Sequence, residues 1–182
     1  KDVAPGARRK VRGIVAGNCL RRLVARTLNQ QYIGEFDAAC APHQFALGTR
    51  AGTDAAALLV KFCCEQGRTI VQTDAKGAYD TVSRRRMLEK LARVAPEVVP
   101  FVSLFYSEAS TYLWDDDAGE THEIPQAEGG EQGDPLMPAL FSLGVSDAYA
   151  AAAQRLHPDD LLIAFLDDVF LITSPERARA SF

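Results

Sequence analysis

The order of its apolar segments predicts an α+β fold for this 182-residue chain. The second half reads strand, helix, helix, two strands, helix, two strands, an order that suits an antiparallel sheet with helices on one face. The composition, 47% hydrophobic and 24% charged, is that of a globular protein with a real core. Because no repeat or long linker interrupts the sequence, we expect one compact unit.

The first half contributes two predicted helices and one strand. Residues 18–32 place apolar side chains near helical spacing, with arginines on the other faces. Residues 54–66 form a second predicted helix, with Thr53 or Asp54 as its N-cap. The first predicted strand is RTIVQTD, which ends at Asp74. The apolar stripe expected on the first helix consists of Leu20, Leu23, Val24 and Leu28.

The second half supplies the remaining predicted elements. Helices are expected over residues 83–94, opened by the cap-type residue Ser83, and over residues 96–107. The segment STYLW-DDDAGE-THEIPQ, residues 110–126, predicts a hairpin because a polar loop with one Gly joins two strand-like runs. We expect the acids of that loop to be solvated. A long helix is predicted over residues 135–156.

The run AFLDDVFLIT, residues 164–173, sets Asp167 and Asp168 in the middle of apolar residues. We interpret this run as two short buried strands that fold back at the acids. Two like charges against a hydrophobic layer are costly unless a cation or a hydrogen-bond network compensates. The pair is therefore a candidate divalent metal site, and the predicted sheet would bring Asp74 to the same place.

Three carboxylates from two separate strands suit a two-metal phosphoryl-transfer site. Their oxygen ligands match the preference of Mg²⁺, with Mn²⁺ as the alternative ion. Magnesium keeps several waters and usually takes only one or two carboxylates plus substrate phosphates, so three acids suffice. Catalysis at such a site is positioning and charge neutralisation more than proton chemistry.

Charge is distributed unevenly along the chain. The net charge is −4, but residues 1–26 carry +7, which leaves −11 for the remainder. One end can attract phosphates while the other holds cations, although a flexible basic tail on an exposed helix would give the same pattern. The four cysteines form no CxxC pair, which predicts reduced, packed thiols. With no apolar run of roughly 18 residues and no signal-peptide core, we expect an intracellular protein without a membrane partner.

Three motifs, in this order, resemble those of reverse transcriptases, the RNA-directed DNA polymerases. DAKGAYD from Asp74 resembles their first catalytic motif, GGEQGDPLMPALF from Gly129 their Gln-Gly-x-Pro motif, and FLDDV from Phe165 their Asp-Asp motif. Upstream, VRGIVAGNCLRRLVARTLNQ resembles a segment of the fingers. HQFALGTRAGTDAA resembles a segment typical of non-LTR retrotransposon and group II intron enzymes. The resemblance covers nearly the whole chain, and five motifs in register make chance improbable.

The resemblance implies a polymerase right-hand fold, with residues 1–68 as a fingers segment and residues 69–182 as a palm that carries the carboxylate site. The chain leaves no room for the primer grip and thumb of this family, so we expect a thumbless fragment of a larger polyprotein or a decayed copy. The implied partners are an RNA template, a DNA primer and deoxynucleoside triphosphates (dNTPs). A nuclear location is the expectation for a eukaryotic retroelement, and the sequence sets no oligomeric state.

The resemblance also implies roles for the residues of the carboxylate site. Asp74 and Asp167 would be the principal ligands of two Mg²⁺ ions, Asp168 the third acid, and the backbone carbonyl of Ala75 an added ligand. Tyr79 matches the aromatic residue that lies under the sugar of the incoming nucleotide and excludes a 2′-hydroxyl. Without the motif, Tyr79 would be interpreted as a core aromatic that opens a helix.

Further matching positions concern the nucleotide. Gln132 and Gly133 match the loop along the incoming nucleotide and its template base, where Gly lets backbone approach the ligand closely. The alternative for these two residues is an ordinary turn before a helix. Arg12 matches the fingers arginine that neutralises the triphosphate, because a guanidinium binds phosphate oxygens bidentately. Lys10 is a second candidate for the same task.

Several residues receive weaker assignments. We expect Asp80 to cap or hydrogen-bond the next helix. Gln44 and Arg50 belong to a motif near the template strand and have no individual role. The arginines at 84–86 either touch the nucleic-acid backbone or cover an exposed helical face. The chain departs from the family pattern at Gly13, Leu166 and Met137. None of these departures removes a ligand or a charge.

Two other functions compete with a reverse transcriptase of a retroelement. An RNA-dependent RNA polymerase shares the palm and the paired acids, but its first motif usually carries a second Asp where this chain has Tyr79. The rival from a different class is a catalytically inactive relic that acts as a nucleic-acid-binding module. The retention of Asp74, Asp167 and Asp168 argues against long decay.

Overall fold

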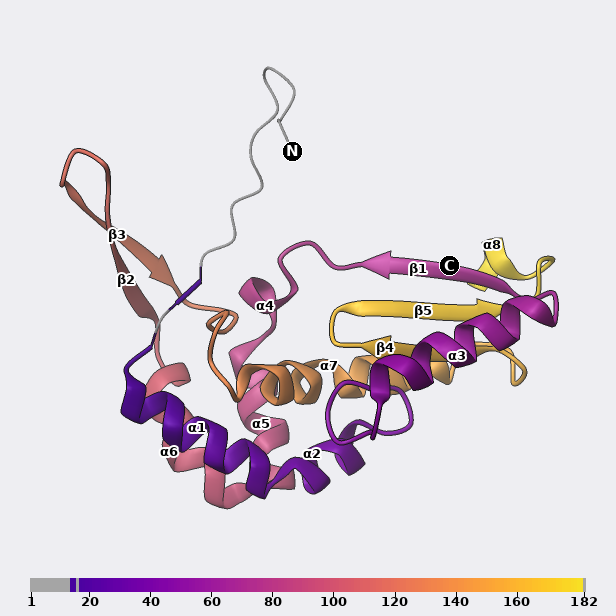
Figure 1. The fold of residues 1–182 in the computed structure, drawn as a ribbon, viewed down its shortest axis with the longest axis horizontal. Helices are drawn as coiled ribbons and strands as arrows, with labels where there is room; N and C mark the ends of the chain where they lie inside the picture. The colour runs from indigo at the N-terminus through magenta and orange to yellow at the C-terminus, as the bar shows by residue number, and fades with distance from the viewer. Residues whose placement is uncertain (1–13, 16, 182) are drawn as a thin grey trace.

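The structure, a computed structural model, describes residues 14–15 and 17–181 (Figure 1). It has the predicted α+β class, with a three-stranded sheet, a separate hairpin and helices packed around them. In chain order the described elements are α1 (Cys19–Gln31), α2 (Ile33–Cys40), α3 (Gly52–Glu65), β1 (Thr69–Asp74), α4 (Ala78–Thr81), α5 (Arg84–Val94), η1 (Pro96–Val98), α6 (Val99–Tyr106), β2 (Ser110–Asp115), β3 (Thr121–Gln126), α7 (Met137–Ala153), β4 (Leu161–Phe165), β5 (Asp168–Thr173) and α8 (Ala178–Ser181).

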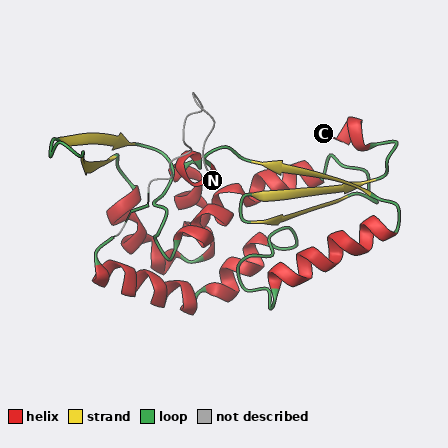
Figure 2. Cartoon of the chain, turned by 45° about the horizontal axis from the view of Figure 1, so that its top comes forward, coloured by secondary structure: helices red, strands yellow, loops and turns green. Residues whose placement is uncertain are grey.

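The sheet has the strand order β1-β5-β4, and both of its ladders are antiparallel. Helix α3 runs along one face of the sheet (Figure 2). On this face Ala56 and Cys63 pack against Ile163 and Ile172. The opposite face carries Leu171, which lines a groove together with residues from the C-terminal part of α7. Helices therefore lie against both faces of the sheet, whereas the sequence suggested only one.

The main core lies among the helices beside the sheet. Met87 and Leu91 of α5 and Leu140 of α7 are completely buried, and α5 packs along α7. Phe36 of α2 and Val102 of α6 join the same cluster. Burial of these apolar side chains is the dominant favourable term in folding, and it fixes α7, which leads to β4.

Helix α1 packs only part of its predicted apolar stripe, because Leu28 contacts the core but the leucines nearer the start of the helix do not. Leu20 is 68% exposed and Leu23 is 62% exposed, while Ala25 is fully buried. The side chain of Arg21 points inward instead and is only 15% exposed. The reason is a set of buried acceptors for its guanidinium, described below, which no periodicity within the helix itself reveals.

The predicted N-cap residue is confirmed for one helix and wrong for another. Ser83 accepts the backbone N–H of Arg86 and caps α5 as predicted. Helix α3 instead starts at Gly52, so neither Thr53 nor Asp54 is its N-cap. A Cβ at position 52 would lie 1.9 Å from the carbonyl oxygen of Phe45, which explains a glycine there. The short helices α2 and α4 were not predicted.

The remaining elements agree with the sequence prediction. Strands β2 and β3 pair with Ser110 opposite Gln126, and this hairpin projects away from the helices (Figure 1). Helix α7 lies within the predicted range 135–156. All four cysteines are free, but only Cys40 and Cys63 are packed, while the other two are exposed. Among residues 14–15 and 17–181, no helix has both the length and the apolar character needed to cross a membrane.

Candidate active site

Two of the three predicted acids lie directly opposite each other on neighbouring strands of the sheet. Strand β1 ends at Asp74, which pairs directly with Asp168, the first residue of β5. Directly opposed residues of an antiparallel pair project to the same face, so both carboxylates lie on the face that α3 partly covers. Asp167 lies in the turn between β4 and β5, as predicted. The sheet thus brings Asp74 to the adjacent acids Asp167 and Asp168, which lie far from it in the sequence.

The acids are more open to solvent than the apolar run around them suggests. Asp74 and Asp168 are exposed and Asp167 is half-buried, because all three lie at the end of the sheet. The Asp168 carboxylate accepts a hydrogen bond from the Gln72 side chain at 3.2 Å. The expected cost of burying like charges therefore does not apply here. The carboxylates are instead accessible to a cation and to a charged substrate.

The donor set at the sheet end fits a hard divalent cation. It consists of carboxylate oxygens, and the exposed residue Ala75, whose carbonyl is the predicted added ligand, directly follows Asp74. Among the described residues, however, the group of three metal-type ligands within 4.8 Å of one another lies at the hairpin tip, formed by Asp116, Glu120 and His122. The three acids of the sheet end are spread more widely, so a shared cation would require their side chains to rotate toward each other.

Two tyrosines flank Asp167. Tyr79 of α4 is half-buried and packs edge-on against the ring of Phe141, with 5.0 Å between ring centroids. Burial first, and then the charge of Asp167, raise the pKa of Tyr79 to about 12. The same causes raise the pKa of Tyr149, on α7, to about 12. Both phenols stay protonated at neutral pH, and sequence reasoning missed Tyr149 because α7 is apolar nearly all round.

The loop before α7 is fastened to α4 by backbone contacts. The N–H groups of Gly129 and Gly130 donate to the carbonyls of Val82 and Tyr79, each at 2.8 Å. Gly129 has a φ of +71°, and a Cβ there would lie 2.3 Å from the carbonyl oxygen of Asp80. Only glycine allows this approach without displacing backbone. The predicted nucleotide loop is therefore fixed beside the helix that carries Tyr79.

Gln132 and Gly133 contact the segment before α1. The carbonyl of Gln132 accepts the N–H of Val15 at 3.0 Å, and a Cβ on Gly133 would lie 2.7 Å from the carbonyl oxygen of Val15. The Gln132 side chain donates to Asp80 at 3.4 Å, so Asp80 bonds this loop rather than the next helix. The two candidate triphosphate ligands, Arg12 and Lys10, lie outside the described residues.

Gln44 holds the turn that carries the paired acids. Its side chain is buried, and its Oε1 accepts the N–H of Leu166 at 2.8 Å. The neighbouring backbone adds to the edge of β4, since Phe45 donates to the carbonyl of Ala164 at 2.9 Å. Gln44 is therefore a positioning residue for Asp167, a role that the sequence left unassigned. Arg50, from the same motif, is exposed.

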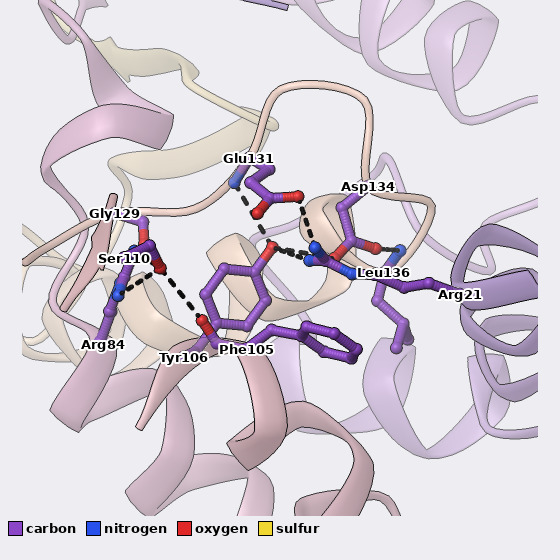
Figure 3. Close-up of polar contacts among 9 residues, drawn as sticks. All are labelled: Arg21, Arg84, Phe105, Tyr106, Ser110, Gly129, Glu131, Asp134 and Leu136. Carbon is purple, nitrogen blue, oxygen red and sulfur yellow. Dashed lines mark hydrogen bonds and ion pairs between the residues drawn. The ribbon is translucent and has the colours of Figure 1, made fainter. Parts of the chain in front are cut away.

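Arg84 is buried and structural, so neither sequence interpretation of it is correct. Its guanidinium donates to the carbonyl of Gly129 at 2.8 Å (Figure 3). It also donates to the carbonyl of Glu108 at 2.6 Å. These bonds join α5 to the base of the hairpin and to the loop before α7. Arg85 and Arg86 are exposed, as one of the two interpretations expected.

A small antiparallel sheet between helices, with two acids at facing strand ends and a third in the adjoining turn, is the arrangement of a nucleic-acid polymerase palm. The chain belongs to the reverse transcriptase (RNA-dependent DNA polymerase) family, whose model matches residues 4–180. This family places the chain among the nucleotidyltransferases and confirms the predicted palm and part of the fingers. A comparison with curated protein sequences gives no match.

The structure is similar to those of two fungal telomerases. Telomerase from Candida albicans, in complex with a TWJ fragment of telomeric RNA, is 15% identical with a TM-score of 0.56, over 88% of this chain and 30% of that chain. Apo telomerase from Candida tropicalis is 13% identical with a TM-score of 0.62, over 87% of this chain and 32% of that chain. Identity at this level supports a shared fold alone. The chain spans about a third of the length of these telomerases.

Proposed function

We propose that this chain is the palm-and-fingers segment of an RNA-directed DNA polymerase from a retroelement of the non-LTR or group II intron type. It would add dNTPs to a DNA primer on an RNA template by two-metal nucleotidyl transfer. The observation that carries the proposal is the direct pairing of Asp74 with Asp168, with Asp167 in the adjoining turn, in a chain of the reverse transcriptase family. The telomerase neighbour described with an RNA fragment supports an RNA partner.

In this proposal the sheet end is where the primer terminus and the nucleotide meet. Asp74, Asp167, Asp168 and the carbonyl of Ala75 would hold two Mg²⁺ ions, or Mn²⁺, which neutralise the charge that develops on the transferred phosphate. The exposure of Asp74 and Asp168 supports this role, because a triphosphate must reach the carboxylates. The candidate ligands along the nucleotide are Gln132, Gly133, Arg12 and Lys10.

Tyr79 supports a deoxynucleotide substrate. Its ring is held by Phe141, and the Gly130 N–H binds its carbonyl, so both the side chain and the backbone of this residue are fixed. A fixed ring under the sugar would collide with a 2′-hydroxyl, whereas an RNA-dependent RNA polymerase must accept that group. A neutral phenol beside Asp167 also adds no negative charge near the phosphates.

A nucleic-acid-binding relic is the second candidate function. The wide spacing of the three acids favours it, since a decayed site need not bring its carboxylates together. Such a protein would bind a primed template without extending the primer.

Primer extension tests the proposal. The full-length protein should extend a DNA primer on an RNA template with Mg²⁺ and dNTPs, and should use ribonucleotides poorly. Binding of the primed template without extension would favour the relic, and a preference for ribonucleotides would favour an RNA polymerase. Either result would contradict the proposal.

A further inference from the structure

A buried ion network lies at the loop that carries Gln132 and Gly133. The residues on either side of this pair are acids, and both bind the same guanidinium (Figure 3). Nη1 of Arg21 lies 2.8 Å from Oε2 of Glu131, and Nη2 lies 3.0 Å from Oδ2 of Asp134. One side chain from α1 therefore binds both ends of the loop tip, residues 131–134.

Tyr106 of α6 completes the network. Its hydroxyl donates to Oδ2 of Asp134 at 2.8 Å and accepts the backbone N–H of Glu131 at 3.4 Å. Burial first, and then the charge of Asp134, raise the pKa of Tyr106, so the hydroxyl keeps the proton that it donates. The Arg21 guanidinium also stacks on the ring of Phe105, 3.8 Å from its centroid. The loop is thus tied to α6 as well as to α1.

The network is almost closed to solvent. Tyr106, Glu131 and Asp134 are 2%, 7% and 8% exposed. Buried carboxylates need their partners, because an unpaired charge in such a place is strongly unfavourable. Arg21 supplies a planar fork that reaches both acids at once, whereas a lysine ammonium is a single point charge that cannot reproduce this geometry. The conformation of residues 131–134 therefore depends on an arginine at position 21.

A second contact joins the same two elements. The segment just before α1 meets the loop tip through the bond from Val15 to Gln132, and Gly133 packs against the Val15 carbonyl. Helix α1 and the loop are consequently held together at two places. The outer surface of the loop remains available, since Gly133 is exposed and Gln132 is half-buried.

We propose that Arg21 is a positioning residue for the incoming nucleotide, which sets Gln132 and Gly133 through Glu131 and Asp134. The inference rests on the proposed polymerase function, because it takes the substrate to be a dNTP. Arg21 touches no substrate in this account. It fixes the loop so that the loop loses no further freedom when the nucleotide binds, and a loosened loop would bind the nucleotide less tightly.

Arg84 offers a matched control for Arg21. Both guanidinium groups have little exposure and lie beside the ring of Tyr106. Arg84, however, binds the carbonyl of Gly129 at the start of the loop, whereas Arg21 binds the loop tip. In full-length protein, Arg21→Lys should raise the apparent KM for dNTP about tenfold and leave kcat within about twofold. Arg84→Lys should leave KM within about twofold at an equal folded fraction, verified by thermal unfolding. Equal KM changes in the two variants, or none in Arg21→Lys, would overturn the inference.

A binding measurement separates this inference from the proposed function. Equilibrium titration of the same proteins with Mg²⁺ and dATP should show about tenfold weaker binding for Arg21→Lys than for Arg84→Lys. If the wild-type protein binds dATP but extends no primer, the proposed function fails and the comparison of the two variants still decides the inference. If the wild-type protein binds no dATP, the inference is overturned.

Discussion

The buried side chain of Gln44 accepts the backbone N–H of Leu166 at 2.8 Å, so the segment before α3 holds the turn that carries Asp167. Leu166 has a φ of +56°, a left-handed conformation that costs a non-glycine residue about 1–2 kcal/mol. The hydrogen bond and the packing around it offset this cost. The position of the paired acids thus depends on a residue far away in the sequence.

Replacement of Gln44 by Met should destabilise the protein and slow nucleotide incorporation. The variant keeps the side-chain volume but leaves the Leu166 N–H without its acceptor, which should lower the free energy of unfolding by about 1–3 kcal/mol. Denaturant unfolding measures the loss. The link between this loss and the turn can be checked in a Leu166→Gly background, where the backbone strain is relieved. There, Gln44→Met should lower the free energy of unfolding by a smaller amount. An equal cost in both backgrounds would contradict this account of the turn.

The strands, the hairpin and the Ser83 cap were predictable because their signals are local. Apolar runs, turn chemistry and capping depend on residues a few positions apart, and all three are visible in the printed sequence. The predicted sheet also brought Asp74 to the Asp-Asp turn, and the register of β1 and β5 confirms that they meet.

The orientation of individual side chains was not predictable in the same way. Arg84 is buried and Arg21 is only 15% exposed because their partners come from distant segments, and for Arg84 these are backbone carbonyls, which no sequence pattern marks. With Arg21 turned inward, Leu20 and Leu23 of α1 remain exposed, whereas Leu28 packs against the core. Asp74 and Asp168 lie at the end of a packed sheet, so their apolar neighbours indicated a burial that the acids themselves do not share.

Arg84→Met should lower the free energy of unfolding by about 3 kcal/mol or more. The change removes a buried guanidinium and leaves the carbonyls of Gly129 and Glu108 without their donor. The neighbouring Arg85→Met is the control, because its exposed pair with Glu89 contributes at most about 0.5 kcal/mol. Urea unfolding of both variants measures the difference, and similar losses would mean that Arg84 is not a structural residue.

Gly129→Ala should destabilise the protein, whereas Gly34→Ala should not. At position 129 the added Cβ meets backbone at 2.3 Å and the φ is +71°, so the loop must shift. Position 34 lies inside α2 with nothing within 4 Å of an added Cβ, and alanine there should stabilise by about 0.5–1 kcal/mol. Thermal unfolding measures both effects. A stabilising Gly129→Ala would contradict the observed contact with α4.

Asp160 should make stability depend on pH below about 4. Its side chain accepts bonds from Arg177 at 2.7 Å and Arg68 at 3.1 Å, and Arg177 is the largest cause that lowers the pKa of Asp160. Because the folded pKa lies below the unfolded value of about 3.9, the stabilisation is present above that value and is lost as the pH falls through the folded pKa.

Asp160→Asn should therefore lower stability at pH 7, by about 1–3 kcal/mol, and reduce the fall in stability that we expect for the wild-type protein between pH 5 and pH 3. Urea unfolding across this range gives the comparison. Asp159→Asn is the control, since that side chain is 70% exposed. A wild-type and an Asp160→Asn protein with parallel pH profiles would show that this carboxylate is not paired in solution.

The central claim is that Asp74 takes part in nucleotidyl transfer at the end of the sheet. Its most direct test is the rate of single-nucleotide incorporation on a primed RNA template with Mg²⁺, measured in full-length protein for Asp74→Asn and for Asp117→Asn, an exposed acid of the hairpin. Asp74→Asn should reduce the rate by about 100-fold or more, because an amide cannot replace the carboxylate as a magnesium ligand, while Asp117→Asn keeps the wild-type rate. Wild-type incorporation by Asp74→Asn would contradict the claim.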